Sequence, residues 1–168
     1  MDLNRIDTAC FTGHRIIPEA DEQTLRIATE NAIRDLLMRG YSTFITGGAL
    51  GFDTMAHRIV LKLREEFPFV RSVMAIPCKN QDAHWREQDR ILYRHLLEMS
   101  DERIVLNPVY TPSCMHERNR FMVDHSSACI AYYDGRHSGG TASTYRYAQR
   151  TLQTLINVFP HSAQIQLR

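Results

Sequence analysis

Short apolar runs alternate with longer segments of helical periodicity along the chain. The runs that predict buried strands are residues 8–12, 42–46, 71–76, 103–106, 128–133 and 154–159. Between them, apolar residues recur three or four positions apart, as do Leu25, Ala28 and Ala32 after Pro18, which is the spacing of an amphipathic helix. Parallel strands joined by crossover helices produce this alternation. The sequence therefore predicts an α/β protein with a Rossmann-like parallel sheet and helices on both faces.

The composition is typical of a globular domain. The chain has 168 residues, of which 43% are hydrophobic and 23% are charged, close to the average for folded proteins. No repeat, linker or low-complexity tract divides it, so we expect a single ligand-binding domain over residues 1–160 and a tail or edge strand over residues 161–168. The formal net charge of +1 argues against a polyanion-binding surface over the whole molecule, and leaves room for a local basic site.

Signals for export or disulfide formation are weak. The N-terminal residues contain no basic segment followed by an apolar stretch, and no apolar run approaches the ~20 residues that span a bilayer. The four cysteines form no CxxC pair, which favours free thiols in a reducing compartment. These features predict a cytoplasmic protein without a membrane partner.

Three of the predicted strands are followed by glycine-rich loops. The loops are Thr12-Gly13-His14-Arg15, Gly47-Gly48-Ala49-Leu50-Gly51-Phe52-Asp53 and Ser138-Gly139-Gly140-Thr141. Glycine lets backbone amides approach a phosphate, and a helix that begins there adds a favourable dipole. Ser138, Thr141 and Thr144 supply hydroxyl donors, and Arg15 supplies a charged fork. Each loop alone is also compatible with a simple tight turn, but three at one edge of a sheet favour a ligand site.

None of these loops matches a standard nucleotide-binding fingerprint. Residues 47–53 read GGALGFD and not GxGxxG, and no GxxxxGK[ST] is present, which disfavours a plain dehydrogenase or a P-loop nucleotidase. The eight histidines include no HExxH pair, and no GxSxG elbow occurs. We therefore expect no metal site, no serine-hydrolase triad and no required cofactor apart from a nucleotide-derived ligand.

Two charged residues have alternative interpretations. Asp53, at the start of a predicted helix, either complements the helix dipole or accepts a hydrogen bond from a ligand hydroxyl. Arg118 lies beside the apolar stripe of the helix expected over residues 115–123. It either pairs with Asp124 or Glu117, or it clamps a phosphate or ribose near the glycine-rich loops.

The motifs, taken together and in order, resemble the YpsA-like branch of the SLOG superfamily. They are TGHR at residues 12–15, GGALGFD at 47–53, CMHERNRFMVD at 114–124 and ACIAYYDGRHSGGT at 128–141. This superfamily is similar to the Lonely Guy phosphoribohydrolases and to the Rossmann domain of DNA-processing protein A. The resemblance implies a pocket that binds or senses a nucleotide or a nucleotide-derived ligand such as ADP-ribose.

The sequence matches only part of the catalytic motif of the Lonely Guy enzymes. Lonely Guy enzymes carry MHxRK, a strand and then PGGxGTxxE, and use the arginine and the glutamate in N-glycosidic cleavage. Residues 115–118 match the first half, so Arg118 carries over, and Gly139-Gly140 match the double glycine. Residues 141–146 contain no carboxylate, although an oxocarbenium-like transition state needs one nearby. Three aspartates elsewhere are alternatives for this role: Asp53, Asp124 and Asp134.

Three functional hypotheses follow. The first is binding of a small nucleotide-type ligand (a nucleoside phosphate, NAD or ADP-ribose) without turnover. The expected pocket residues are Gly13, His14, Arg15, Gly47, Gly48, Gly51, Asp53, Arg118, Asn119, Asp134, Ser138, Gly139, Gly140, Thr141 and Thr144. The second is an N-glycosidic hydrolase of nucleoside monophosphates, with Arg118, Asp53 or Asp124 as candidate catalytic residues. The third is single-stranded nucleic-acid binding, ranked lowest because no basic run occurs. The resemblance leaves a homodimer open.

Overall fold

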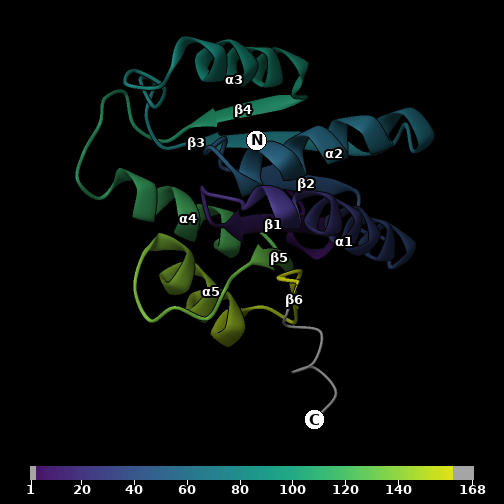
Figure 1. Ribbon diagram of the computed structural model, residues 1–168. Helices are drawn as coiled ribbons and strands as arrows, with labels where there is room; N and C mark the ends of the chain where they lie inside the picture. The colour runs from purple at the N-terminus through teal and green to yellow at the C-terminus, as the bar shows by residue number, and fades with distance from the viewer. Residues whose placement is uncertain (1–2, 161–168) are drawn as a thin grey trace.

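The computed structural model describes residues 3–160, which form a parallel sheet with helices on both faces (Figure 1). The strands are β1 (Thr8–Gly13), β2 (Thr43–Thr46), β3 (Arg71–Ile76), β4 (Glu102–Val105), β5 (Ala128–Tyr132) and β6 (Thr154–Asn157). The helices are α1 (Glu19–Met38), α2 (Phe52–Glu66), α3 (Glu87–Met99), α4 (Cys114–Asp124) and α5 (Gly140–Thr151), and a 3-10 turn, η1 (Arg5–Asp7), precedes β1. The predicted α/β, Rossmann-like fold is confirmed. The tail or edge strand expected over residues 161–168 lies outside the described residues.

The strand order is β4-β3-β2-β1-β5-β6, and every neighbouring pair is parallel. The neighbouring interior strands β1 and β5 pair from Ala9 with Ala128 to Gly13 with Tyr132. Apart from Gly13, all their residues are buried. Strands covered on both faces read as continuous apolar runs and not as alternating patterns, which is why the short runs in the sequence identified them.

Helices α1, α2 and α3 cover one face of the sheet, and α4 and α5 cover the other. Phe11 and Phe44 belong to the same buried cluster as the apolar residues of α1 and α2, whereas Cys10 and Val73 pack with α4 and α5. The chain changes face after β4, because α4 carries it across to β5. A topological switch point therefore lies between β1 and β5, and ligands bind at the carboxyl ends of the strands beside such a point.

The last strand ends earlier than its sequence predicts. β6 ends at Asn157, two residues before the expected end at residue 159. The side chain of Asn157 replaces ladder bonds at this point: its Oδ1 accepts from the amides of Tyr133 and Phe159, each at 3.2 Å, and its Nδ2 donates to the Tyr133 carbonyl at 2.9 Å. The apolar residues after Asn157 therefore continue as irregular chain.

Candidate functional site

A cleft of about 720 Å³ opens at the carboxyl ends of β1 and β5. Its walls are the loops that follow these two strands, the inner face of α4 and the start of α5. The predicted site residues that line it are Gly13, His14, Arg15, Asp53, Arg118, Asn119, Asp134, Ser138, Gly139, Gly140 and Thr141. The structure thus brings together residues that lie far apart in the sequence, from the loops after β1 and β5 and from helices α2, α4 and α5.

The other predicted site residues lie outside the cleft. Gly48 packs against Met74 and Tyr93, and Gly51 lines a neighbouring groove. The hydroxyl of Thr144 donates to the Gly140 carbonyl at 2.8 Å, inside α5. Asp124, at the end of α4, accepts a hydrogen bond of 2.5 Å from the Tyr147 hydroxyl and is not a cleft residue.

Arg118 faces Asp53 across the floor of the cleft, and both side chains are buried. Arg118 is 4% exposed and Asp53 is 6% exposed. The Oδ2 atom of Asp53 accepts from the amides of Gly47 at 3.1 Å and Ala49 at 3.4 Å. Burial raises the pKa of the Asp53 carboxyl, and the Arg118 charge and the two amides oppose that shift. Asp53 therefore anchors the loop after β2 and supplies the negative charge opposite Arg118.

Of the two interpretations of Arg118, the ion pair with Asp124 or Glu117 is wrong. Neither Asp124 nor Glu117 contacts it, because Glu117 accepts from the side chains of Ser113 and Asn107. The carboxylate whose charge acts on Arg118 is Asp53 of α2. Positions so far apart in the sequence give no local signal of pairing.

Position 47 requires glycine because the Arg118 guanidinium occupies the space that a Cβ atom would take. Arg118 Nη1 donates to the Gly47 carbonyl. A Cβ atom at this position would lie 2.5 Å from Arg118 Nη1 and 2.8 Å from Asp53 Oδ2. The loop after β2 thus makes room for a buried arginine, whereas the sequence suggested a phosphate.

Gln81 belongs to the same buried cluster, and sequence reasoning missed it. Its Oε1 accepts from Arg118 Nη1 at 3.4 Å, and its Nε2 donates to the Gly47 carbonyl at 3.4 Å and to the Tyr93 hydroxyl at 3.3 Å. Gln81 lies in the irregular segment between β3 and α3, where neither periodicity nor a motif distinguishes it.

The start of α5 faces the cleft without a side-chain cap. Its N-cap residue is Gly139, with a φ of +105°, and no side chain makes a capping hydrogen bond there. Gly140 leaves open space, since a Cβ atom would meet only Asn119 Nδ2, at 3.9 Å. The first amides of a helix carry no intrahelical bond and concentrate partial positive charge. This end of α5 can therefore accept an anion.

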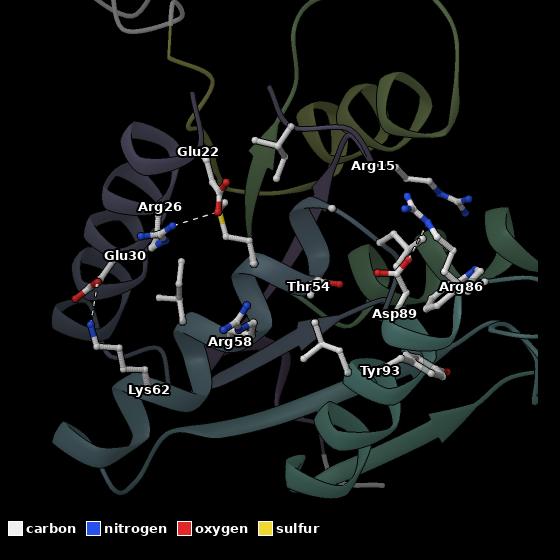
Figure 2. A pocket seen from close by; sticks show the side chains of 17 residues that line it. Arg15, Glu22, Arg26, Glu30, Thr54, Arg58, Lys62, Arg86, Asp89 and Tyr93 are labelled. Carbon is white, nitrogen blue, oxygen red and sulfur yellow. Dashed lines mark hydrogen bonds and ion pairs between the residues drawn. The ribbon is translucent and has the colours of Figure 1, made fainter. Parts of the chain in front are cut away.

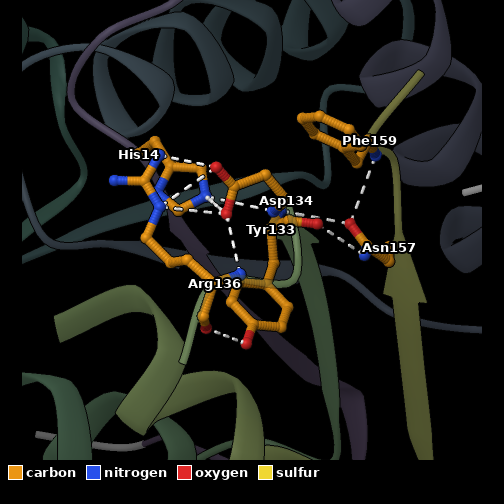
Figure 3. A network of polar contacts seen from close by, with 6 residues as sticks. All are labelled: His14, Tyr133, Asp134, Arg136, Asn157 and Phe159. Carbon is orange, nitrogen blue, oxygen red and sulfur yellow. Dashed lines mark hydrogen bonds and ion pairs between the residues drawn. The ribbon is translucent and has the colours of Figure 1, made fainter. Parts of the chain in front are cut away.

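His14, Asp134 and Arg136 form a polar network at the mouth of the cleft (Figure 3). His14 Nε2 lies 3.1 Å from both the amide nitrogen and the Oδ1 atom of Asp134. Arg136 Nη2 is 2.6 Å from Asp134 Oδ2, and its charge holds the pKa of that carboxyl well below its usual range. Burial lowers the pKa of His14. Neutral His14 therefore accepts a hydrogen bond from the Asp134 amide, and this contact holds the loop after β5 beside β1.

Arg15 differs from the other basic residues of the cleft. Arg118 and Arg136 are occupied by the contacts above, whereas within residues 3–160 the Arg15 side chain has no hydrogen-bond or ion-pair partner. It is exposed at the rim. An unpaired cation in the same cleft as an uncapped helix start supplies the charge that a phosphate group requires.

Residues 3–160 contain neither a candidate metal centre nor a candidate membrane span. No group of three or more histidine, cysteine or acidic side chains there is arranged to hold a metal ion. No helix in the same range is long and apolar enough to cross a membrane.

Three relatives share about a quarter to a third of their aligned residues with this chain. It is 36% identical over 120 residues to the uncharacterized SPbeta prophage-derived protein YoqJ of Bacillus subtilis (strain 168), covering 64% of this chain and 70% of YoqJ. It is 25% identical over 139 residues to a UPF0398 protein of Bacillus velezensis, covering 80% of this chain and 76% of that protein. It is 25% identical over 117 residues to the UPF0398 protein YpsA of Bacillus subtilis (strain 168), covering 68% of this chain and 65% of YpsA.

The fold also matches a solved structure. The X-ray structure of DNA processing protein A from Streptococcus pneumoniae aligns with a TM-score of 0.62 at 14% identity, covering 89% of this chain and 49% of that protein. The chain spans about half of that protein's length, and the likeness shows a shared fold. The sequence model of YpsA, described as the YspA SLOG family, matches residues 18–158, which include β2 to β6 and most of the cleft. The chain therefore belongs to the YspA SLOG family.

Proposed function

We propose that the cleft between β1 and β5 binds a nucleotide or nucleotide-derived ligand, with a phosphate group on the start of α5. The observation that carries the proposal is the uncapped helix start at Gly139 and Gly140, which opens into a cleft that also contains the unpaired Arg15. A helix N-terminus with glycine at its first positions is a general anion site. The cation at the rim adds a charge-assisted hydrogen bond.

The rest of the cleft suits the apolar part of such a ligand. Its volume of about 720 Å³ lies within the range of small-molecule sites. Ile16, Met115 and Phe159 add apolar surface to its walls. A base or sugar ring packs against surfaces of this kind, while a few polar groups fix its orientation. The ligand class that the family resemblance implies, nucleoside phosphates and ADP-ribose, combines these two chemistries.

The carboxylates of the cleft favour binding without N-glycosidic cleavage. They are Asp21, Asp53 and Asp134. Asp53 holds two loop amides opposite Arg118, and Asp134 is held by Arg136 and lies beside His14. Asp21 lies in the first turn of α1, where its charge complements the helix dipole. A carboxylate that stabilises an oxocarbenium-like ion has to face the sugar carbon, and the contacts of Asp53 and Asp134 oppose this.

The variant Gly140→Asp tests the proposal at the phosphate position. We expect it to lower the affinity for AMP and ADP-ribose by about tenfold or more, because a fixed carboxylate repels the phosphate. The fold should be preserved, since an acidic side chain in the first turn favours a helix and a Cβ atom fits at this position. Isothermal titration calorimetry measures the affinity, and thermal unfolding measures the stability.

Ser143→Asp is the matched control. It adds the same charge to the first turn of α5, at an exposed position that does not line the cleft. Equal weakening by both variants would mean that net charge and not the helix start governs binding. Release of free base from a nucleoside monophosphate in the same samples would replace the binding proposal with the hydrolase hypothesis.

A further inference from the structure

A second groove of about 860 Å³ adjoins the cleft, on the face of the sheet covered by α1, α2 and α3 (Figure 2). Arg15 lines both cavities, so they meet at the loop after β1. In Figure 2, Arg15 lies at one end of the groove and Lys62 at the other, with Arg58 between them. The two cavities therefore share a boundary at Arg15.

The groove has an excess of positive charge. Each of its three carboxylates already faces a basic partner: Glu22 with Arg26 at 3.2 Å, Glu30 with Lys62 at 4.0 Å and Asp89 with Arg86 at 3.8 Å. Arg15 and Arg58 remain, and in the part of the chain that the structure describes neither has a hydrogen-bond or ion-pair partner. Both are exposed. Two unpaired guanidinium groups favour an anionic ligand with more than one charge.

An aromatic wall lines the same groove. Trp85 lines the groove, and its ring contacts that of Tyr93 edge-on, with centroids 5.1 Å apart and an interplanar angle of 69°. Ile59 and Leu92 extend this surface with aliphatic carbon. A flat ring stacks on tryptophan with an energy that does not depend strongly on which base it is. The groove therefore offers the contacts of a second ring site.

We infer that the groove is a second subsite, which takes the far half of a dinucleotide-type ligand with two ring-bearing halves joined by a pyrophosphate. One phosphate lies on the start of α5, Arg15 spans the junction, and the second ring stacks on Trp85 with Arg58 beside it. The inference rests on the proposed function, because the near half occupies the cleft.

Fluorescence tests the inference directly, since Trp85 is the only tryptophan of the chain. The full chain is titrated with AMP, which has one ring, and with NAD, which has two. We expect NAD to change the Trp85 emission and to bind about tenfold more tightly than AMP, as an added charge-assisted contact implies. AMP should bind without changing the emission.

A charge reversal distinguishes ligand binding in the groove from ligand binding in the cleft. Arg58→Glu should lower the affinity for NAD by about tenfold and leave that for AMP within about twofold, because Arg58 lies only in the groove. Arg103→Glu, the same reversal at an exposed position on the edge strand β4, should change neither.

The outcomes are distinguishable. Equal affinities for AMP and NAD, with no change in Trp85 emission, overturn the second subsite and leave the cleft proposal standing. No binding of either ligand overturns both. Salt-dependent binding of a short single-stranded oligonucleotide that is tighter than NAD binding overturns the dinucleotide assignment in favour of a nucleic-acid strand.

Discussion

Replacing Arg118 with methionine should lower the free energy of unfolding by about 3 kcal/mol, at the upper end of the cost of leaving buried polar groups without a partner. Methionine keeps much of the side-chain length but leaves the buried carboxylate of Asp53 without its opposing charge. The Gly47 carbonyl also loses a donor. Urea unfolding followed by circular dichroism measures the change.

A second substitution identifies the cause. Arg118→Met combined with Asp53→Asn should be more stable than Arg118→Met alone, because asparagine is neutral and its side-chain oxygen still accepts from the amides of Gly47 and Ala49. Arg120→Met is the matched control: Arg120 is exposed on the same helix and lies 4.1 Å from the ring centre of Tyr147. We expect it to cost less than about 1 kcal/mol. Equal losses in the two single variants would contradict a stabilising interaction between the buried charges of Arg118 and Asp53.

Variants of Arg118 report on the stability of the fold as well as on ligand binding. The family resemblance implies a ligand role for Arg118, but in the structure it joins α4 to the loop after β2 through the Gly47 carbonyl and Gln81. Loss of binding in a variant of Arg118 would thus report loss of structure as well as loss of contact. Gly140 is the better position for a test of ligand binding, since a side chain fits there without displacing its neighbours.

Stability should fall by about 3 kcal/mol between pH 6.5 and pH 4 through the titration of His57 alone. His57 is 1% exposed, and burial, assisted by the charge of Arg64, lowers its pKa to about 4. Its Nδ1 lies 2.9 Å from the Thr46 hydroxyl and its Nε2 3.1 Å from the Ser100 hydroxyl. The unfolded chain binds the proton at higher pH, so the stabilisation is complete above pH 6.5 and is lost as the pH falls.

The comparison of two histidine variants checks this pH dependence. His57→Gln should flatten the dependence of the urea midpoint between pH 7 and pH 5, although its stability at pH 7 falls. His95→Gln, at an exposed position on α3, should retain the wild-type slope. Burial lowers the pKa of His14 as well, so part of the slope should remain in His57→Gln. An unchanged slope in His57→Gln would contradict the assignment.

The fold could be predicted because its signals are local. A strand buried on both faces, such as β1 or β5, is a short apolar run, and the helices between strands show a spacing of three or four residues. The end of β6 could not be predicted in this way. Val158 and Phe159 continue the apolar run, but the Asn157 side chain takes over hydrogen bonds that a longer ladder would make.

The candidate site was predictable where it consists of loops at one sheet edge, and not where it consists of contacts between distant residues. The glycines at residues 139–140 mark the start of α5 as expected. By contrast, Asp53 meets Arg118 and His14 meets Asp134 because of how the helices cross over the sheet. Gly47 shows the same limit, since glycine near a phosphate and glycine near a buried arginine look identical in a sequence.

The most direct test of the central claim is a titration of the ¹⁵N-labelled protein with AMP, followed by amide chemical shifts. Binding of the phosphate at the start of α5 predicts the largest amide shifts at Gly139, Gly140 and Thr141, and smaller shifts in the loop after β1. The shifts in both segments should reach a plateau as the AMP concentration rises. Gly140→Asp should abolish these shifts. Shifts concentrated away from this edge of the sheet, or none at saturating AMP, would contradict a phosphate site in the cleft.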